Sequence, residues 1–419
     1  MLDWCLNDLR RAVVATFLFS VLVTLVFWAF VPAQYYELGT TDFTERDLPM
    51  AQQIVDGAPF LDPTNIVAVG FPLVLVGMIV LAHTFGVPLA LVLQGLALIE
   101  MGITSVLILL LARLIWTPLL AFVAALLWTT YPFALWLTKQ TSTELSFMVF
   151  FFAAVYFWWR GLVLVRSQLA LFGLAGLLIG LAMLIRPFAA GFPLVMLLGI
   201  ICKRTLVKNR LGAVALLCVG CMSVVLPWEF LVRSETGRWV LLNDNGVKSI
   251  RDGLSFAVES KSYRAALDVP EDIKALMLDA RSQQATLDSS VKIGAFLWDN
   301  FREQPGTVMK FLALKAVRAW YATDSQRFEI LSAGVQLVYL LLGTLGIVMT
   351  WRHRPHARFL VLMGLATVLY FWLITLSALP ILRYMIPAMG LVIVFIPGAV
   401  YLPRLLRRAV AQPQMENHP

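Results

Sequence analysis

The chain has 419 residues, of which 60% are hydrophobic and only 14% are charged, and its formal net charge is +8. A mean hydropathy of +0.81, with several apolar runs long enough to cross a bilayer, excludes a soluble globular protein. The basic residues form no stripe with interleaved aromatic residues, which excludes nucleic-acid binding. The composition predicts an all-α polytopic membrane protein.

The first apolar run covers residues 12–31, directly after Arg10 and Arg11. It is too long for a signal-peptide core and is followed by Pro32 instead of a small-residue cleavage site, so we expect a retained first transmembrane helix. Further apolar runs lie at residues 66–85, 88–112, 117–137, 144–165, 169–185, 188–202, 211–231, 330–350, 359–377 and 381–402. These runs are the candidate membrane segments.

The positions of Lys and Arg decide whether residues 66–85 are counted as a span. If this run does not cross the membrane, the short basic segments collect on the cytoplasmic side; if it crosses, the clusters after Arg11 move outside. We therefore expect residues 66–85 to form a juxtamembrane or re-entrant piece, broken at Gly70-Phe71-Pro72. The prediction is about ten transmembrane helices in the inner (cell) membrane with both termini in the cytoplasm, and whether 66–85 spans stays open.

This topology divides the chain into three parts. Residues 1–232 form a membrane domain that includes a first external loop at 33–87, and residues 330–419 form the C-terminal transmembrane helices and a cytoplasmic tail. Residues 233–329 are external, and their fourteen basic and thirteen acidic residues predict a small folded periplasmic domain. Residues 309–321 have basic and apolar faces and are expected to lie along the membrane surface.

The first loop concentrates acidic residues in a chain that has few of them. Its carboxylates are Asp42, Glu45, Asp47, Asp56 and Asp62. Thr44 and Asp47 have the spacing of a capping box, which predicts a short amphipathic helix that rests on the membrane surface and ends at Gly57. Asp42 is expected in the loop just before this helix, near the lipid headgroups.

Cations on the predicted outer face are also few. Outside residues 233–329 they are Arg46, Lys139, Arg186 and Arg383, each within a few residues of a predicted outer membrane boundary. Cations gathered at one side of a helical bundle suit a phosphate-bearing lipid headgroup. Glu100, in the middle of the run 88–112, is either functional or paired between helices, because an acid is costly within the membrane.

The order of these features resembles the GT-C superfamily of membrane glycosyltransferases, in the branch of protein O-mannosyltransferase-like and aminoarabinose-transferase-like enzymes. The matching motifs, in chain order, are an external acid followed by AQQIVDG at 51–57, Gly-Phe-Pro-Leu at 70–73, Ser142-Thr143-Glu144, Arg186-Pro187, Leu226-Pro227-Trp228, Asn243-Asp244-Asn245-Gly246, and Arg383-Tyr384 with Pro387. The resemblance implies inverting transfer of a sugar from a polyprenyl-phosphate carrier to an acceptor at the external face, with Asp42 as general base.

Other site roles follow from this expectation. Arg186, Arg383 and Lys139 are predicted to hold the donor phosphate, and Tyr384, Asn243 and Asn245 to contact substrate. Glu45, Asp47 and Glu144 are possible second acids. No cofactor is certain and a divalent metal is possible. The family often has two adjacent acids where this chain has Asp42-Phe43, and this departure argues against a second-acid or metal-ligand role. The sugar, the carrier length and the acceptor (lipid, glycan or protein) stay open.

Less specific interpretations stay open beside these. Asp42 can be a solvated loop acid, Glu45 and Asp47 can be favoured by the helix dipole, and Glu144 can cap its helix. Arg186 and Arg383 can be interfacial residues whose charged ends reach the headgroups. The alternative function is a lipid-linked sugar flippase or another membrane transporter, although the sequence has no internal repeat of the kind common in transporters.

Overall fold

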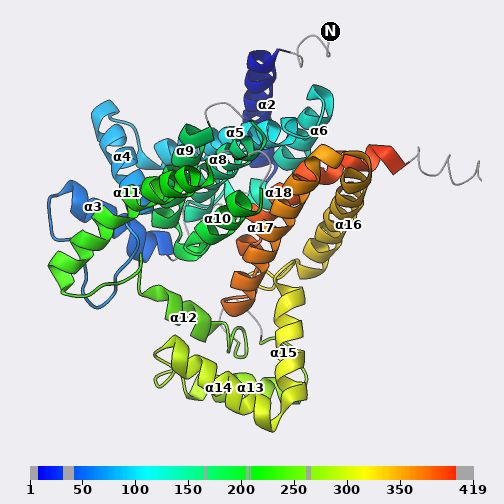
Figure 1. The fold of residues 1–419 in the computed structure, drawn as a ribbon. Coiled ribbons are helices and arrows are strands. Elements are labelled where there is room, and N and C mark those ends of the chain that lie inside the picture. Colours follow the sequence, from blue (N-terminus) through cyan, green and yellow to red (C-terminus); the bar gives the residue numbers. More distant parts are fainter. Residues whose placement is uncertain are drawn as a thin grey trace, which may run out of the picture.

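A computed structural model describes residues 8–31, 42–164, 168–203, 207, 209–260 and 266–402. Every regular element within these ranges is a helix (Figure 1). The first part of the predicted external loop and the predicted cytoplasmic tail after residue 402 lie outside the described residues.

Seven helices of the described residues are long and apolar enough to cross a membrane. They are α2 (Leu9–Phe30), α5 (Leu89–Arg113), α8 (Thr143–Val163), α9 (Gln168–Ile185), α11 (Arg210–Thr236), α16 (Glu329–His353) and α17 (Arg358–Ser377). Shorter apolar helices are α4 (Gly70–Phe85), α6 (Pro118–Thr129), α10 (Phe192–Cys202) and α18 (Ile386–Phe395). The protein is therefore an all-α polytopic membrane protein, as predicted, and the count of ten spans remains a prediction.

Helix α8 lies at the centre of the bundle. Its ring Phe151 packs against Phe192 of α10 and Phe371 of α17, with ring centroids 5.0 and 5.1 Å apart. Trp158, also on α8, is fully buried and donates a hydrogen bond from its indole nitrogen to the carbonyl of Met196 at 3.1 Å. This packing fixes the middle and the second half of α8 against α10 and α17.

Helices α9 and α11 meet backbone to backbone. A Cβ atom at Gly176 of α9 would overlap the carbonyl of Leu217, and one at Gly220 of α11 would overlap the carbonyl of Gly173. Small residues allow membrane helices to approach this closely, which gives van der Waals contact in a solvent that provides no hydrophobic drive. The close contact therefore joins the middle of α9 to the middle of α11.

The first loop differs from its prediction in how its helix begins. A π-helical turn at Phe43–Asp47 precedes α3 (Leu48–Val55), so Thr44 lies inside the helical segment and is not its N-cap. The predicted capping box is therefore wrong. The predicted end is confirmed, because Gly57 follows α3 with φ of +66°, a conformation that glycine adopts at no steric cost.

The Gly70-Phe71-Pro72 stretch starts helix α4 and does not break it. Proline is tolerated in the first turn of a helix, where its missing N–H has no partner to lose. A Cβ at Gly70 would lie 2.5 Å from the backbone of Leu184, so the start of α4 packs directly on the end of α9. The 16 residues of α4 extend about 24 Å at 1.5 Å per residue, less than the roughly 30 Å hydrocarbon core.

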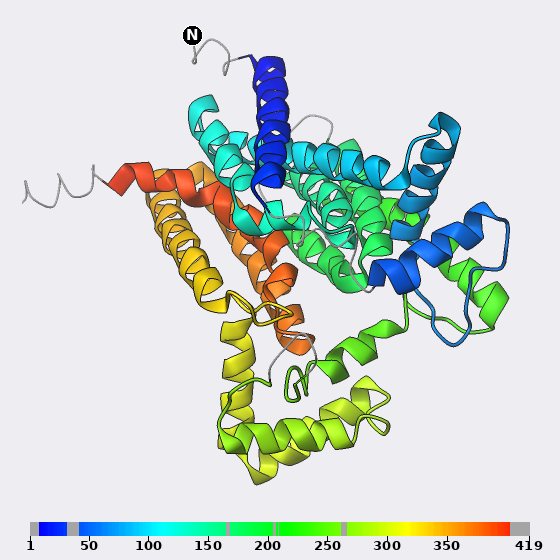
Figure 2. The same ribbon diagram turned by 180° about the vertical axis from the view of Figure 1, so that it is seen from behind.

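Residues between α11 and α16 form four helices, which we call the loop domain. They are α12 (Asn245–Asp252), α13 (Glu271–Ser282), α14 (Ser290–Glu303) and α15 (Pro305–Arg318). The domain has its own hydrophobic core, built mainly from Leu254, Phe256, Ile273, Met277, Ile293, Phe296 and Phe311. Figure 2 shows it projecting from one end of the bundle, which we call the loop end.

The loop domain joins the bundle at the end of α17. A Cβ at Gly253 would overlap the carbonyl of Ala378, and the amide of Leu382 donates a hydrogen bond to the carbonyl of Ala322 at 2.9 Å. Lys315 and Arg318 of α15 are buried in this region, with exposed fractions of 1% and 5%. Lys315 and Arg318 therefore face protein, whereas Lys310 is 62% exposed, and the membrane-surface position of residues 309–321 stays a prediction.

Candidate functional site

A cavity of about 410 Å³ opens at the loop end of the bundle, and we call it the polar cavity. Six separate chain segments converge on it: the first loop, the start of α8, the end of α9 with the residues after it, the segment from the end of α11 into α12, the end of α17, and the turn η5 (Leu382–Tyr384). Eight of the predicted site residues line it: Asp42, Asp47, Glu144, Arg186, Asn243, Asn245, Arg383 and Tyr384. The structure therefore brings together side chains that are up to 342 positions apart, from residue 42 to residue 384.

Glu144 lies in the first turn of α8 and is only 4% exposed. Its Oε1 forms ion pairs with Arg186 and, at 3.7 Å, with Nε of Arg383. Both guanidinium groups also lie over the ring of Tyr384, with Cζ atoms 5.1 and 5.3 Å from its centroid. One buried carboxylate and one aromatic ring therefore fix the positions of two arginines.

The first-loop acids share a single arginine. Nε of Arg46 lies 2.8 Å from Oδ1 of Asp47, and its Nη1 lies 3.4 Å from Oδ1 of Asp42. Asp47 is buried, and burial raises its pKa above the ordinary value against the opposing effect of Arg46. The Asp42 side chain is 57% exposed, so it is the acid of this pair that a substrate in the cavity can reach.

Charges in the polar cavity balance. The carboxylates are Asp42, Asp47 and Glu144, and the guanidinium groups are Arg46, Arg186 and Arg383. Arg383 has a further carboxylate partner, since its Nη1 lies 3.7 Å from Oδ2 of Asp324. Guanidinium groups offer paired donors that match phosphate oxygens, and here acids hold them in place before any anion binds.

The segment after α11 crosses the cavity in a fixed conformation. The amide of Leu242 donates to Oε1 of Glu229 at 2.7 Å, and the indole of Trp228 donates to the carbonyl of Leu242 at 3.0 Å. Leu242 has φ of +65°, which is strained for a branched side chain and is held by these bonds. Asn243 and Asn245 are thereby presented to the cavity.

Two predicted site residues lie elsewhere. Lys139 is 7% exposed, and its Nζ lies 3.3 Å from the carbonyl of Trp28, beside a separate cavity of about 50 Å³ that Glu100 also lines. Glu45 is not among the residues that line the polar cavity. Glu100 accepts a hydrogen bond from Ser146 of α8, which favours the interpretation that it is paired between helices.

The sequence interpretation missed two contributors. The sequence marks Arg46 only as an outer cation, whereas in the structure it contacts both Asp42 and Asp47. Asp324 received no notice because it lies among the many charged residues of the loop domain, and only the fold places it beside Arg383. Charged residues are rare in the membrane domain, so each one there indicates a possible role. They are common in the loop domain, so a single acid there does not stand out.

The acids of the polar cavity do not fit a metal site as they stand. Within the part of the chain that the structure describes, no group of three or more His, Cys, Asp or Glu residues is placed to hold a metal ion. Asp42, Asp47 and Glu144 are each in an ion pair with an arginine, so metal coordination would first require those guanidinium groups to leave. We therefore derive no step through a metal.

A second cavity, of about 680 Å³, adjoins the polar cavity between α9, α10 and α11, and we call it the apolar cavity. Its lining is almost entirely hydrophobic and includes Leu194, Leu197, Leu217, Met222, Val225 and Leu226. Ala190 and Leu241 line both cavities. Leu194 is 64% exposed, as expected for a side chain that faces lipid, so the apolar cavity lies between the polar cavity and the lipid-facing side of α10.

Comparisons with known proteins bear on the fold. Residues 71–228 match the family model of dolichyl-phosphate-mannose-protein mannosyltransferase, a range that contains Glu144 and Arg186. No curated protein sequence matches the chain at a significant level.

Solved structures of an archaeal oligosaccharyltransferase, AglB from Archaeoglobus fulgidus, are similar to this chain. The complex with an inhibitory peptide and a dolichol-phosphate aligns with a TM-score of 0.56 and 14% identity, over 96% of this chain and 52% of that one. The form tethered to an acceptor peptide with an NVT sequon aligns with a TM-score of 0.53 and 14% identity, over 95% of this chain and 50% of that one. The apo form aligns with a TM-score of 0.51 and 14% identity, over 96% of this chain and 52% of that one. The chain spans about half the length of these proteins. It is an all-α polytopic membrane protein with the GT-C fold, as its sequence motifs predict.

Proposed function

We propose that this protein is a membrane glycosyltransferase that moves a sugar from a polyprenyl-phosphate carrier to an acceptor, with inversion at the anomeric carbon. The observation that carries the proposal is the polar cavity itself. There an exposed carboxylate and a pair of positioned arginines face one space, and an apolar cavity adjoins that space. The matched family model and the GT-C fold support the same reaction class.

The donor is proposed to lie across both cavities. Its polyprenyl chain occupies the apolar cavity, and its phosphate passes Ala190 and Leu241 to reach Arg186 and Arg383. Negative charge grows on the phosphate oxygens as the sugar leaves, and fixed guanidinium groups stabilise that charge in a site partly shielded from water. Lys139 drops out of the proposed phosphate ligands, because it lies at a different cavity.

Asp42 is proposed as the general base. The acceptor hydroxyl or amine loses its proton to the Asp42 carboxylate as its oxygen or nitrogen bonds to the anomeric carbon. The bond from that carbon to the phosphate oxygen breaks, and the phosphate leaves with the electron pair. General-base catalysis of this kind contributes roughly 10²- to 10⁴-fold in rate. Exposure of Asp42 and its contact with Arg46 keep it in reach and oriented.

Glu144 is proposed as a positioning residue instead of a second acid. It is buried and bound to both Arg186 and Arg383, so the acceptor cannot reach it without displacing them. Its charge holds the two guanidinium groups together while the site is empty. Asp47 is proposed to do the same for Arg46.

The experiment that tests the function is transfer of labelled sugar from a panel of polyprenyl-phosphate sugars, in membranes with matched levels of wild type, Asp42→Asn or Asp56→Asn. We expect one donor to be consumed by wild type and Asp42→Asn to lower turnover by roughly a hundredfold or more. Asp56 is the matched control, an exposed first-loop acid at the end of α3 that contacts Gln52 and does not line the cavity.

Other outcomes would count against the proposal. Equal turnover by Asp42→Asn would remove Asp42 as the base. Failure of wild type to consume any donor, together with movement of a lipid-linked sugar across vesicle membranes, would instead establish the flippase alternative, which needs the same lipid cavity and arginines but no base.

A further inference from the structure

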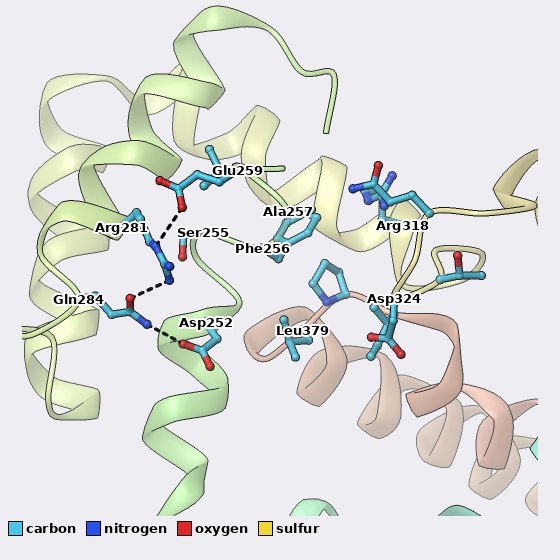
Figure 3. A pocket seen from close by; sticks show the side chains of 15 residues that line it. Asp252, Ser255, Phe256, Ala257, Glu259, Arg281, Gln284, Arg318, Asp324 and Leu379 are labelled. Carbon is cyan, nitrogen blue, oxygen red and sulfur yellow. Dashed lines mark hydrogen bonds and ion pairs between the residues drawn. The ribbon is translucent and has the colours of Figure 1, made fainter. Parts of the chain in front are cut away.

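A third cavity, of about 300 Å³, lies where the loop domain meets the end of α17, and we call it the junction cavity. Figure 3 shows its lining residues. None of the steps proposed above uses it. Its walls come from the residues after α12, the end of α13, the loop after α15, and residues 379–381.

One wall is a chain of hydrogen-bonded polar side chains. Arg281 lies 3.6 Å from Oε2 of Glu259 and donates to Oε1 of Gln284 at 2.8 Å. Gln284 in turn donates from Nε2 to Oδ1 of Asp252 at 3.0 Å (Figure 3). This wall therefore presents acceptors and donors side by side, in positions that its internal bonds hold in place.

The opposite side is largely apolar. Phe256, Leu379, Pro380 and Ile381 contribute to it, and Figure 3 shows Phe256 and Leu379 between the polar chain and Asp324. Arg318 adds little charge here, because both of its terminal nitrogens bind Glu329, at 3.0 and 2.8 Å. One side of the cavity is therefore apolar, and the opposite side carries hydrogen-bonding groups.

The charge of the cavity selects against anions. Asp252, Glu259 and Asp324 are 47%, 57% and 59% exposed in their side chains, and each is paired with an arginine: Arg251 at 3.7 Å, Arg281 at 3.6 Å and Arg383 at 3.7 Å. A phosphate or carboxylate ligand would have to compete with these carboxylates for their arginines, whereas a neutral ligand breaks no ion pair. A sugar ring is neutral, has hydroxyls that both donate and accept along its edge, and has C–H faces that pack on apolar side chains. It matches both walls.

The junction cavity and the polar cavity are next to each other. Ala378 lines the polar cavity and Leu379, the next residue, lines the junction cavity. Asp324 of the junction cavity is the residue that binds Arg383, which lines the polar cavity. Two features thus lie between the cavities: the Asp324–Arg383 ion pair, and the backbone segment that is hydrogen-bonded through Leu382 to Ala322.

Backbone strain is concentrated at this cavity as well. Ala257 and Gln326, both of which line it, have φ of +54° and +57°, a region that costs energy for residues other than glycine. The amide of Leu267 donates to the carbonyl of Ala257 at 2.8 Å and so helps to hold one of these conformations. Such strain is maintained where a surface must have one particular shape.

We propose that the junction cavity is the acceptor subsite and that the acceptor is a neutral saccharide, of which one or two rings occupy the cavity. This inference rests on the proposed glycosyl transfer and names its second substrate class. The saccharide binds with its hydroxyls along Arg281, Gln284 and Asp252, and the ring that receives the sugar extends past the Asp324–Arg383 ion pair into the polar cavity.

The test separates binding from transfer. Purified full-length protein is examined by saturation-transfer NMR with maltose, mannobiose and chitobiose, and with glucose 6-phosphate and an uncharged tripeptide as competing probes. We expect a neutral disaccharide to bind wild type and Asp42→Asn equally. Loss of one charge-assisted hydrogen-bonding group in Arg281→Ala should weaken binding about tenfold. Lys274→Ala, on the same helix but paired with Glu271 away from the cavity, should leave it unchanged.

Gln284→Ala provides a second variant with no change of charge, and melting temperatures identify any variant that fails to fold. Binding of no neutral disaccharide, or equal binding by Arg281→Ala and Gln284→Ala, would overturn the subsite. Preference for glucose 6-phosphate or the tripeptide would overturn the saccharide assignment. Saccharide binding without any transfer would count against the proposed function alone, and transfer to a saccharide that binds equally well without Arg281 would count against this subsite alone.

Discussion

At the scale of single residues, Glu144 links the two arginines of the polar cavity. Its carboxylate is the shared counter-charge of Arg186 and Arg383, and all three side chains are partly or fully removed from water. Removing one partner of a buried ion pair is costly, because the remaining charge keeps its desolvation cost and loses its compensation. Replacing Glu144 by a neutral residue of the same shape therefore removes its charge and keeps its volume, so the effect of the charge alone can be measured.

We predict that Glu144→Gln lowers the free energy of unfolding by about 3 kcal/mol and raises KM for the lipid donor more than it lowers kcat. The reason is that the arginines lose their fixed positions while Asp42 stays in place. Thermal unfolding in detergent and donor-concentration series measure the two effects. Glu235→Gln, at an exposed acid near the end of α11, is the control. A pure loss of kcat would instead point to a direct chemical role.

Residues of the site were predictable to the extent that charge is rare around them. In the membrane domain, an acid or an arginine next to an apolar run stands out, and eight of the predicted residues do meet in one cavity. Lys139 is the exception. Its position near a membrane boundary does not determine which neighbour its side chain faces, and in the structure it faces Trp28. Asp324 could not be found, since its importance comes only from its contact with Arg383.

At the scale of elements, local sequence patterns identified the helices better than their ends. The Thr44–Asp47 spacing fits a capping box, but a π-helical turn begins at Phe43, and no short-range pattern distinguishes the two. The Gly70-Phe71-Pro72 pattern predicts a break in a helix, whereas Pro72 lies in the first turn of α4, where proline is well tolerated. Both errors concern whether a residue lies before or after the start of a helix.

Helix α15 carries a buried base whose state depends on pH. Lys315 is 1% exposed, and burial lowers its pKa from 10.5 to about 7. The unfolded chain therefore binds more protons than the folded one between about pH 7 and pH 10.5. Stability attributable to this residue rises with pH through that window, and the penalty is complete below about pH 7.

We accordingly predict that Lys315→Met is more stable than wild type at pH 6 and that this advantage shrinks toward pH 9. Methionine keeps the length and apolar stem of lysine and has no charge to bury. Melting temperatures of both proteins across this range measure the difference, in which all other titrating groups cancel. A difference that is constant with pH would show that Lys315 does not titrate in the window.

At the scale of the whole molecule, the protein consists of two hydrophobic cores that meet at a small junction. The bundle core and the loop-domain core are separate, and α12, α15 and the end of α17 connect them. The sequence predicted a folded segment between two groups of membrane helices, but not its docking. Both the polar and the junction cavities depend on that docking, which joins residues more than a hundred positions apart, such as Gly253 and Ala378.

Gly253 is the point where this arrangement can be tested. A side chain there would overlap the backbone carbonyl of Ala378, which cannot rotate away as a side chain could. We predict that Gly253→Leu separates the loop domain from the bundle, at a cost on the order of 1–3 kcal/mol, and abolishes both saccharide binding and sugar transfer. The bundle core should remain folded, because it does not include this contact.

Limited proteolysis, the saccharide-binding measurement and the sugar-transfer assay measure these effects. Gly294→Leu is the matched control, since a Cβ at Gly294 of α14 meets no atom within 4 Å. The loop domain of Gly253→Leu should be cleaved faster than that of Gly294→Leu, while fragments of the bundle stay protected. Because the polar cavity also uses residues of α12, donor binding should weaken along with acceptor binding. Normal transfer by a variant with a detached loop domain would show that the bundle alone contains the complete active site.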